Sequence, residues 1–217
     1  MQLAEKIDHT ILKPDCTLKD IQSVCEEAIS HRFYSVCVPP FYVKDAFQFL
    51  EKTNVKVTTV VGFPMGYATT PAKVEEIKRA IDDGAEEVDA VVNICAVKSG
   101  NWNYVRNDVD SMTRIAHMRG KTIKVILETG MMTQEELDRL CKVCIESEVD
   151  FVKTSTGILA AGANVDIVSW LRAQLPPSIK IKASGGLRSY QDAVLLIEAG
   201  AARLGSSASV QIVQGGK

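Results

Sequence analysis

The sequence lacks a strong excess of charge of either sign. Its 25 lysines and arginines face 27 aspartates and glutamates in 217 residues, so no nucleic-acid or anionic-membrane partner is indicated. It also lacks an apolar run near the roughly 18 residues that a membrane helix needs. Residues 1–6 lack the hydrophobic core of a signal peptide. We therefore expect a soluble cytoplasmic protein that binds neither nucleic acid nor membrane.

Side chains that could hold a metal or redox centre are scarce as well. The chain has only three histidines, and its six cysteines come without a secretion signal, so reduced thiols are expected. Cys141 and Cys144 have the spacing of a redox or zinc motif, but no second pair accompanies them. Both fall on the apolar face of a helical pattern, which favours buried helix positions.

What the sequence does contain is an alternation of short apolar runs with amphipathic segments, repeated eight times. Eight such units predict parallel strands joined by crossover helices. The natural arrangement is a single α/β domain over residues 1–217, a closed (β/α)8 TIM barrel. An open doubly wound sheet is the alternative, but its glycine-rich fingerprint is missing from the first strand–helix turn. The strands are expected at residues 7–12, 34–38, 55–61, 87–93, 123–128, 150–157 (ending in a polar turn), 179–183 and 202–204.

Helix starts are marked by capping residues. Thr70–Pro71 indicates a cap followed by the first helical position, and this helix would bury Val74, Ile77 and Ile81. The eighth helix is expected at residues 206–213. Capping boxes are expected at Thr17 with Asp20 and at Thr133 with Glu136.

Two lysines stand in apolar strands. Lys153 lies between Val152 and Thr154, where its charge is costly unless it is paired or lost. Side chains alternate along a strand, so Lys182 of the seventh strand should face the barrel interior together with Lys180. By the same rule Asp8 and Thr10 share one inward face, and so do Asp89 and Asn93 on the fourth strand. These polar groups would converge on the mouth at the carboxyl ends of the strands, where barrel enzymes place their chemistry.

The two lysines would lie on neighbouring strands, about 4.8 Å apart in backbone. Two ammonium groups about 4 Å apart repel by about 4 kcal/mol at an effective dielectric of 20. A charged Lys182 would therefore make it easier to keep Lys153 neutral, and a neutral amine can form a Schiff base with an aldehyde. The alternative is a buried stem with its head in solvent. That reading is favoured for one lysine alone, but not for two beside Asp89.

A second signal points to phosphate. Gly185-Gly186 follows the seventh strand, and Gly205-Ser206-Ser207 follows the eighth. Glycines allow close backbone approach, and free N–H groups at a helix start suit an anion. Loops seven and eight are frequent phosphate sites in barrels.

These motifs together carry a resemblance. Residues 7–14 (IDHTILKP), 60–64 (VVGFP), 87–89 (EVD), 125–129 (VILET), 151–157 (FVKTSTG) and 182–188 (KASGGLR) resemble the deoxyribose-phosphate aldolase family, which are class I aldolases with a (β/α)8 fold. The resemblance runs nearly end to end.

The resemblance implies reversible cleavage of 2-deoxy-D-ribose 5-phosphate to D-glyceraldehyde 3-phosphate and acetaldehyde. It implies an imine on Lys153, perturbed by Lys182, with Asp89 as a proton donor or acceptor. It implies no metal or organic cofactor, and pairing into homodimers or higher homo-oligomers. The substrate-binding positions it implies are Asp8, Thr10, Cys37, Thr156, Gly157, Gly185, Gly186, Gly205, Ser206 and Ser207.

Three departures from the family qualify the resemblance. Lys180 stands where the family usually has a small residue, so it either reaches the lower mouth of the barrel or adds a third charge beside Lys182. Ile158 replaces a phosphate-binding lysine of some members. The chain ends at Gly215-Gly216-Lys217, without the tail that carries a tyrosine to the site in some members.

Two rival functions stay open at this point. One is a phosphosugar isomerase that uses Glu128 as a base without an imine. The other is a catalytically silent barrel that only binds phosphate or a partner.

Overall fold

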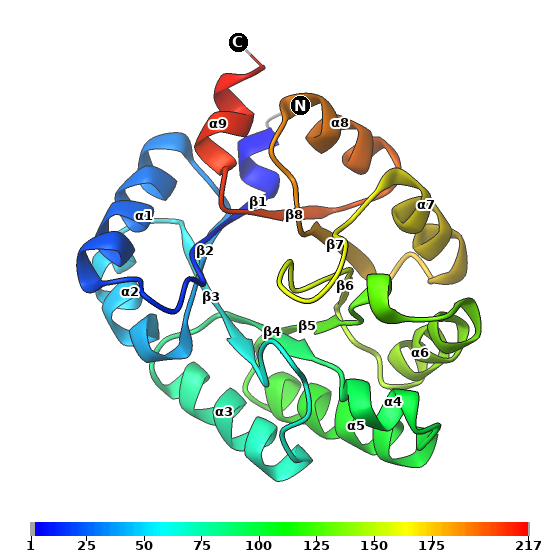
Figure 1. The fold of residues 1–217 in the computed structure, drawn as a ribbon. Coiled ribbons are helices and arrows are strands. Elements are labelled where there is room, and N and C mark those ends of the chain that lie inside the picture. Colours follow the sequence, from blue (N-terminus) through cyan, green and yellow to red (C-terminus); the bar gives the residue numbers. More distant parts are fainter. Residues whose placement is uncertain (1–2, 217) are drawn as a thin grey trace.

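The structure is a computed structural model that describes residues 3–216. Its strands form a closed barrel in the order β1 to β8, each parallel to its neighbours, with β8 closing on β1. Figure 1 shows the strands as an inner ring and the helices as an outer ring. The predicted (β/α)8 barrel is confirmed. Its strands are β1 (Ile7–Thr10), β2 (Ser35–Val38), β3 (Lys56–Val61), β4 (Glu87–Val91), β5 (Thr122–Ile126), β6 (Phe151–Lys153), β7 (Lys180–Ser184) and β8 (Arg203–Ser206).

The helices bury their apolar faces against the outside of the barrel, and both predicted capping boxes are present. No helix among residues 3–216 is long and apolar enough to cross a membrane. Short 3-10 turns lie at Leu3–Lys6, Pro40–Tyr42 and Thr129–Met131. The α-helices are α1 (Leu18–His31), α2 (Val43–Leu50), α3 (Thr70–Asp82), α4 (Ile94–Lys98), α5 (Trp102–Met118), α6 (Gln134–Glu146), α7 (Val165–Gln174), α8 (Tyr190–Glu198) and α9 (Ser209–Gln214).

The end of the barrel differs from the sequence prediction. Strand β8 continues through Gly205 to Ser206, and α9 begins only at Ser209. Gly205 pairs with Asp8 on one side and with Ser184 on the other. A Cβ at Gly205 would lie 3.0 Å from Lys182 Cε. The glycine is therefore needed for the room it leaves beside Lys182, and it does not end the strand.

Helix α3 also corrects the prediction. Its N-cap is Thr69, one residue early, and the Thr70 hydroxyl instead donates to Asp108 Oδ1 at 2.8 Å. The buried stripe contains Lys73 at 0% exposure, whereas Val74 is only partly buried. A polar network between helices thus occupies a position that hydrophobic periodicity assigns to an apolar side chain.

A short helix after β4 was not predicted. Strand β4 ends at Val91, and the side chain of Asn93 accepts the Ala96 N–H at 3.0 Å as the N-cap of α4. Asn93 therefore stabilises a helix start and does not extend the inward row of Asp89.

All six cysteines are free thiols, as the composition predicted. Cys141 and Cys144 are buried on α6, and burial raises the pKa of the Cys141 thiol to about 12. Neither thiol therefore has the acidity of a reactive cysteine.

Candidate active site

Lys153 ends β6 with its side chain inside the barrel. The side chain is 4% exposed, and its ammonium group donates to Asp89 Oδ2 at 2.9 Å. The outward neighbours Val152 and Thr154 are fully buried, so the strand is held on both faces. This lysine has a single carboxylate partner among the described residues.

Lys182 lies beside Lys153, with which it is paired in the β6–β7 register. Its ammonium group donates to Asp89 Oδ2 at 2.7 Å, the same oxygen that Lys153 contacts, and it also pairs with the Asp8 carboxylate. The two lysines, Asp8 and Asp89 therefore meet in one place, as strand alternation predicted.

The charges of this cluster fix the protonation of several members. Burial would raise the pKa of the Asp89 carboxyl, but the ammonium groups of Lys124, Lys153 and Lys182 outweigh it and hold that pKa well below its usual range. Burial would likewise lower the pKa of Lys182, but Asp8 and Asp89 raise it above its ordinary value. Lys182 is thus the permanent cation of the lysine pair.

Three further charged residues, which were not predicted as part of the site, lie beneath these groups. Lys124 donates to Asp89 Oδ1 at 2.8 Å and lies 2.7 Å from Glu87 Oε2. Arg203 donates to Asp8 Oδ1 at 2.8 Å and to Glu87 Oε2 at 3.1 Å. A lysine between Ile123 and Val125 follows the same alternation as Lys182 between Ile181 and Ala183, so the signal was available.

Lys180 does not join the cluster. It is the first residue of β7, its side chain is exposed, and its ammonium group lies 5.6 Å from the centre of the Phe151 ring. The first of the two alternatives for this residue, the lower mouth of the barrel, is therefore correct.

The glycine loops after β7 and β8 are joined. Gly185 and Gly186 have φ values of +95° and +76°, in the region that favours glycine. The loop after β6 packs closely on Gly185 as well, because a Cβ on Gly162 would lie 1.9 Å from the Gly185 carbonyl oxygen. The Ser206 hydroxyl donates to the Leu187 carbonyl at 2.7 Å, whereas Ser207 is exposed. Ser206 therefore fixes the two loops to each other, and Ser207 faces solvent.

The turn after Lys153 is fixed by a buried carboxylate. Glu128 Oε2 accepts the Thr156 N–H at 3.0 Å, and Gly157 takes a φ of +79°. Glu128 Oε1 and the Ser155 hydroxyl have no partner within residues 3–216. Glu128 thus anchors the segment that leads from β6 to α7, which projects to the middle of the ring in the view of Figure 1.

Thr10 and Cys37 complete the inner wall on the other side. They are paired in the β1–β2 register, and the Thr10 hydroxyl donates to the Asp8 carbonyl at 2.9 Å. Burial raises the pKa of the Cys37 thiol. Cys37 is therefore a neutral wall of the site.

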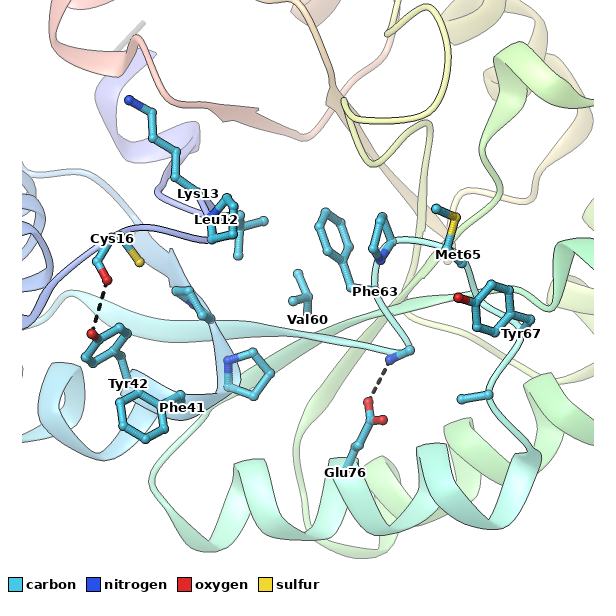
Figure 2. Close-up of a pocket in the computed structure, with 16 residues that line it drawn as sticks. Leu12, Lys13, Cys16, Phe41, Tyr42, Val60, Phe63, Met65, Tyr67 and Glu76 are labelled. Atoms are coloured by element: carbon cyan, nitrogen blue, oxygen red, sulfur yellow. Dashed lines mark hydrogen bonds between the residues drawn. The ribbon is translucent and has the colours of Figure 1, made fainter.

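A cleft of about 920 Å³ opens at the ends of β1, β2 and β3. Figure 2 shows Val60 between Leu12 on one side and Phe63 on the other. Val60 is the register partner of Asp89, so the floor of the cleft adjoins the strand that carries this carboxylate. The lining is mostly apolar and includes none of the lysines of the cluster.

A (β/α)8 barrel that buries two lysines against one carboxylate has the groups needed for imine-forming carbonyl chemistry, and this defines the class of protein. Comparison with known proteins gives the family. Residues 3–214 match the DeoC/LacD family aldolase model, and the chain belongs to this family.

The relatives agree with the assignment. Deoxyribose-phosphate aldolase of Thermococcus gammatolerans is 46% identical over 219 residues, with 100% of this chain and 97% of the relative covered. The protein of the same name from Desulfitobacterium hafniense is 47% identical, with 98% of each chain covered.

Solved structures agree as well. Deoxyribose phosphate aldolase from Aeropyrum pernix, described as having a unique tetrameric structure, matches with a TM-score of 0.91 and 33% identity over 98% of this chain and 89% of that one. A structure described as QR15, an aldolase, matches with a TM-score of 0.92 and 36% identity over 98% and 94%.

Proposed function

We propose that the protein is a class I aldolase that cleaves 2-deoxy-D-ribose 5-phosphate reversibly to D-glyceraldehyde 3-phosphate and acetaldehyde. One observation carries the assignment of the site: Asp89 Oδ2 accepts from both Lys153 and Lys182. An amine that shares its counter-ion with a second, more firmly held cation is the one that can lose its proton. The relatives named above supply the substrate.

The reaction begins at Lys153. Its neutral amine adds to the C1 aldehyde, and uptake of a proton with loss of water gives a protonated imine, which is the electron sink. A base takes the proton of the C3 hydroxyl, the C2–C3 bond breaks, and its electron pair moves into the imine to form an enamine. The three-carbon fragment leaves as the aldehyde. Protonation of the enamine carbon and hydrolysis of the imine then release acetaldehyde and regenerate Lys153.

Asp89 and Lys182 would handle the protons. Asp89 contacts both lysine nitrogens, so a proton that leaves one of them has a charged acceptor within hydrogen-bonding distance. Lys182, held charged by Asp8 and Asp89, stabilises negative charge that develops on the C3 oxygen. Asp8 and Thr10 line the same space from β1.

The phosphate would lie at the other end of the substrate, over the loops after β7 and β8. The positive φ values at Gly185 and Gly186 suit a loop whose backbone N–H groups would face a bound anion, and the exposed Ser207 would contact it. Ser206 and Gly205 would support these loops from inside the barrel. Ser206 donates a hydrogen bond to the Leu187 carbonyl, and Gly205 leaves room for the Lys182 side chain. Thr156 and Gly157 would line the passage between the amine and the phosphate, with Cys37 in the opposite wall.

A coupled assay of retro-aldol turnover with 2-deoxy-D-ribose 5-phosphate tests the proposal. We expect stoichiometric release of the two aldehydes, and borohydride in the presence of acetaldehyde should inactivate the enzyme. Isomerised sugar phosphate without cleavage would favour an isomerase with Glu128 as base. An absence of any turnover would favour a silent barrel.

We further propose that the protein works in the cytoplasm as a homo-oligomer, a dimer or larger. The tetrameric relative from Aeropyrum pernix supports self-association. Sedimentation at micromolar concentration tests it, and a monomer would contradict it.

A further inference from the structure

The groups beneath the proposed catalytic residues form a distinct set, which we call the lower ionic layer: Lys124, Glu87 and Arg203. The three side chains are at most 7% exposed. The Arg203 guanidinium lies 3.3 Å from the centre of the Tyr34 ring, which covers it. Solvent therefore screens this layer weakly, and its charges act strongly on the groups above.

The lower ionic layer holds one oxygen of each of the two carboxylates above it, Asp8 and Asp89. Lys124 takes Asp89 Oδ1, so Oδ2 is left for Lys153 and Lys182. Arg203 takes Asp8 Oδ1, so Oδ2 is left for Lys182. Asp8 and Asp89 thus each have one oxygen fixed from below and one paired with Lys182, although Lys124 also lies 4.0 Å from Asp8 Oδ2.

The ion pairs give the cluster a surplus of one positive charge. Its three carboxylates are Asp8, Glu87 and Asp89, and its four cations are Lys124, Lys153, Lys182 and Arg203. Loss of one proton would bring the formal charge to zero. The charge count alone does not say which cation loses it.

The contacts single out the donor of that proton. Arginine keeps its proton in proteins. Lys182 is paired with Asp8 and Asp89, and Lys124 lies within 4.0 Å of Asp8, Glu87 and Asp89. Lys153 is paired with Asp89 alone, through an oxygen that it shares. Lys153 is therefore the least firmly held of the four cations.

We propose that Lys124 and Glu87 are positioning residues that set the proton count of the cluster and thereby the pH at which Lys153 becomes a nucleophile. The proposal rests on the proposed imine chemistry of Lys153. Neither residue needs to contact the substrate, because Lys124 acts through Asp89, which it contacts, and Glu87 acts through Lys124.

Other titratable groups face the same interior. Cys37 comes from β2, and Glu128 lies at the end of β5 without an ion pair to the cluster. Strand β3 contributes Thr58 and Val60, which do not titrate. These groups are unchanged in every variant below, so they do not alter the direction of the expected shifts.

Two single substitutions move the charge in opposite directions. Lys124→Met removes a positive charge, so Lys153 should hold its proton more firmly. The pH midpoint of imine formation should then rise by about one pH unit or more. Glu87→Gln removes a negative charge at nearly constant shape and should lower the midpoint by a similar amount. The readout is the rate of the borohydride-reduced acetaldehyde adduct on Lys153 as a function of pH.

The double variant Lys124→Met, Glu87→Gln distinguishes an electrostatic role of these two residues from a merely structural one. It removes a mutually paired cation and anion, so the midpoint should return to within a few tenths of a unit of the unmodified protein. A merely structural role predicts that the double variant is at least as impaired as Lys124→Met. That outcome, or midpoints that stay fixed in both single variants, would overturn the proposal.

A matched control is Lys73→Met, which removes another fully buried lysine from an ion pair outside the barrel interior. Its midpoint should not move. Should Lys124→Met not fold, the shift of Glu87→Gln alone still decides the question. If the unmodified protein forms no adduct, the proposed function fails. If it forms one and no variant moves the midpoint, only the proposal about the lower ionic layer fails.

Discussion

Two regions of the molecule bury lysines, and they treat the charge in opposite ways. Between α3 and α5, Lys73 donates to Asp108 Oδ2 at 2.7 Å and to the Val91 carbonyl at 2.9 Å. Inside the barrel, Lys153 shares Asp89 Oδ2 with Lys182. Among the described residues Lys73 is the one cation paired with Asp108, whereas Lys153 shares its carboxylate oxygen with Lys182.

The difference shows that burial alone does not turn a lysine into a nucleophile. Lys73 is fully buried, yet its pairing is complete and its role is to join α3, α5 and the end of β4. A Cβ on Gly62 would lie 3.1 Å from its Cε, so it also supports the loop after β3. What distinguishes Lys153 is a local surplus of cations around one carboxylate.

The largest expected effect separates these two lysines directly. Lys153→Ala should lower retro-aldol turnover by about a thousandfold or more, because it removes the covalent centre. Lys73→Met should retain turnover at a temperature where it is folded. The measurement is the coupled assay, with circular dichroism to verify the fold. Comparable turnover in Lys153→Ala would refute the assignment of that residue.

For stability we expect the opposite ranking of the two lysines, with Lys73 contributing more than Lys153. Lys73→Met leaves Asp108 buried without its cation, so the free energy of unfolding should fall by about 3–5 kcal/mol. Urea denaturation measures this, with Lys78→Met as a control because Lys78 is partly exposed and pairs at the surface with Glu75. Equal stability of the two variants would mean that the buried pair contributes no more than a surface pair.

Acid should weaken the barrel interior. The pKa values of Asp8 and Asp89 are lowered in the folded protein, where burial opposes the shift and nearby cations outweigh it. The stability they contribute is present above the unfolded carboxyl pKa of about 3.9 and is lost as pH falls from there toward the folded values. Urea midpoints at stepped pH should fall in this window, and Asp89→Asn should flatten the fall. Stability that holds or rises on acidification would contradict the ion-pair assignment.

The smallest expected effect is that of Lys182 on the pH at which Lys153 forms the imine. Lys182→Ala removes one of the cations that compete for Asp89, so the pH midpoint of imine formation should rise by about one pH unit. The pH–rate profile of adduct formation measures it, and Lys180→Ala, at the lower mouth, is the control. An unchanged profile would show that Lys182 does not tune Lys153.

Much of this arrangement could be predicted from the sequence because it depends on alternation along single strands. Asp8, Asp89, Lys153 and Lys182 each stand in short apolar runs, and a closed barrel turns the same parity inward on every strand. Strand alternation also turns Lys124 inward, so its place in the lower ionic layer was predictable. Its pairing with Glu87 and Asp89, and that of Arg203 with Asp8 and Glu87, was not, because each pair joins residues 35 or more positions apart in the chain.

The other differences have the same origin. Val74 was expected in the buried stripe of α3, but Asp108 on another helix makes Lys73 the buried residue. Gly205 was interpreted as a strand end, whereas the neighbouring Lys182 side chain requires the space of a missing Cβ. In both places a contact from a distant segment decided what the local pattern could not.

Peptide mapping after borohydride reduction with acetaldehyde tests the central claim most directly. It locates the adduct among the lysines that are fully or nearly fully buried within residues 3–216, namely Lys73, Lys124, Lys153 and Lys182. The account predicts one two-carbon unit, on Lys153 alone. An adduct on Lys182 or Lys124, or turnover without any adduct, would contradict it.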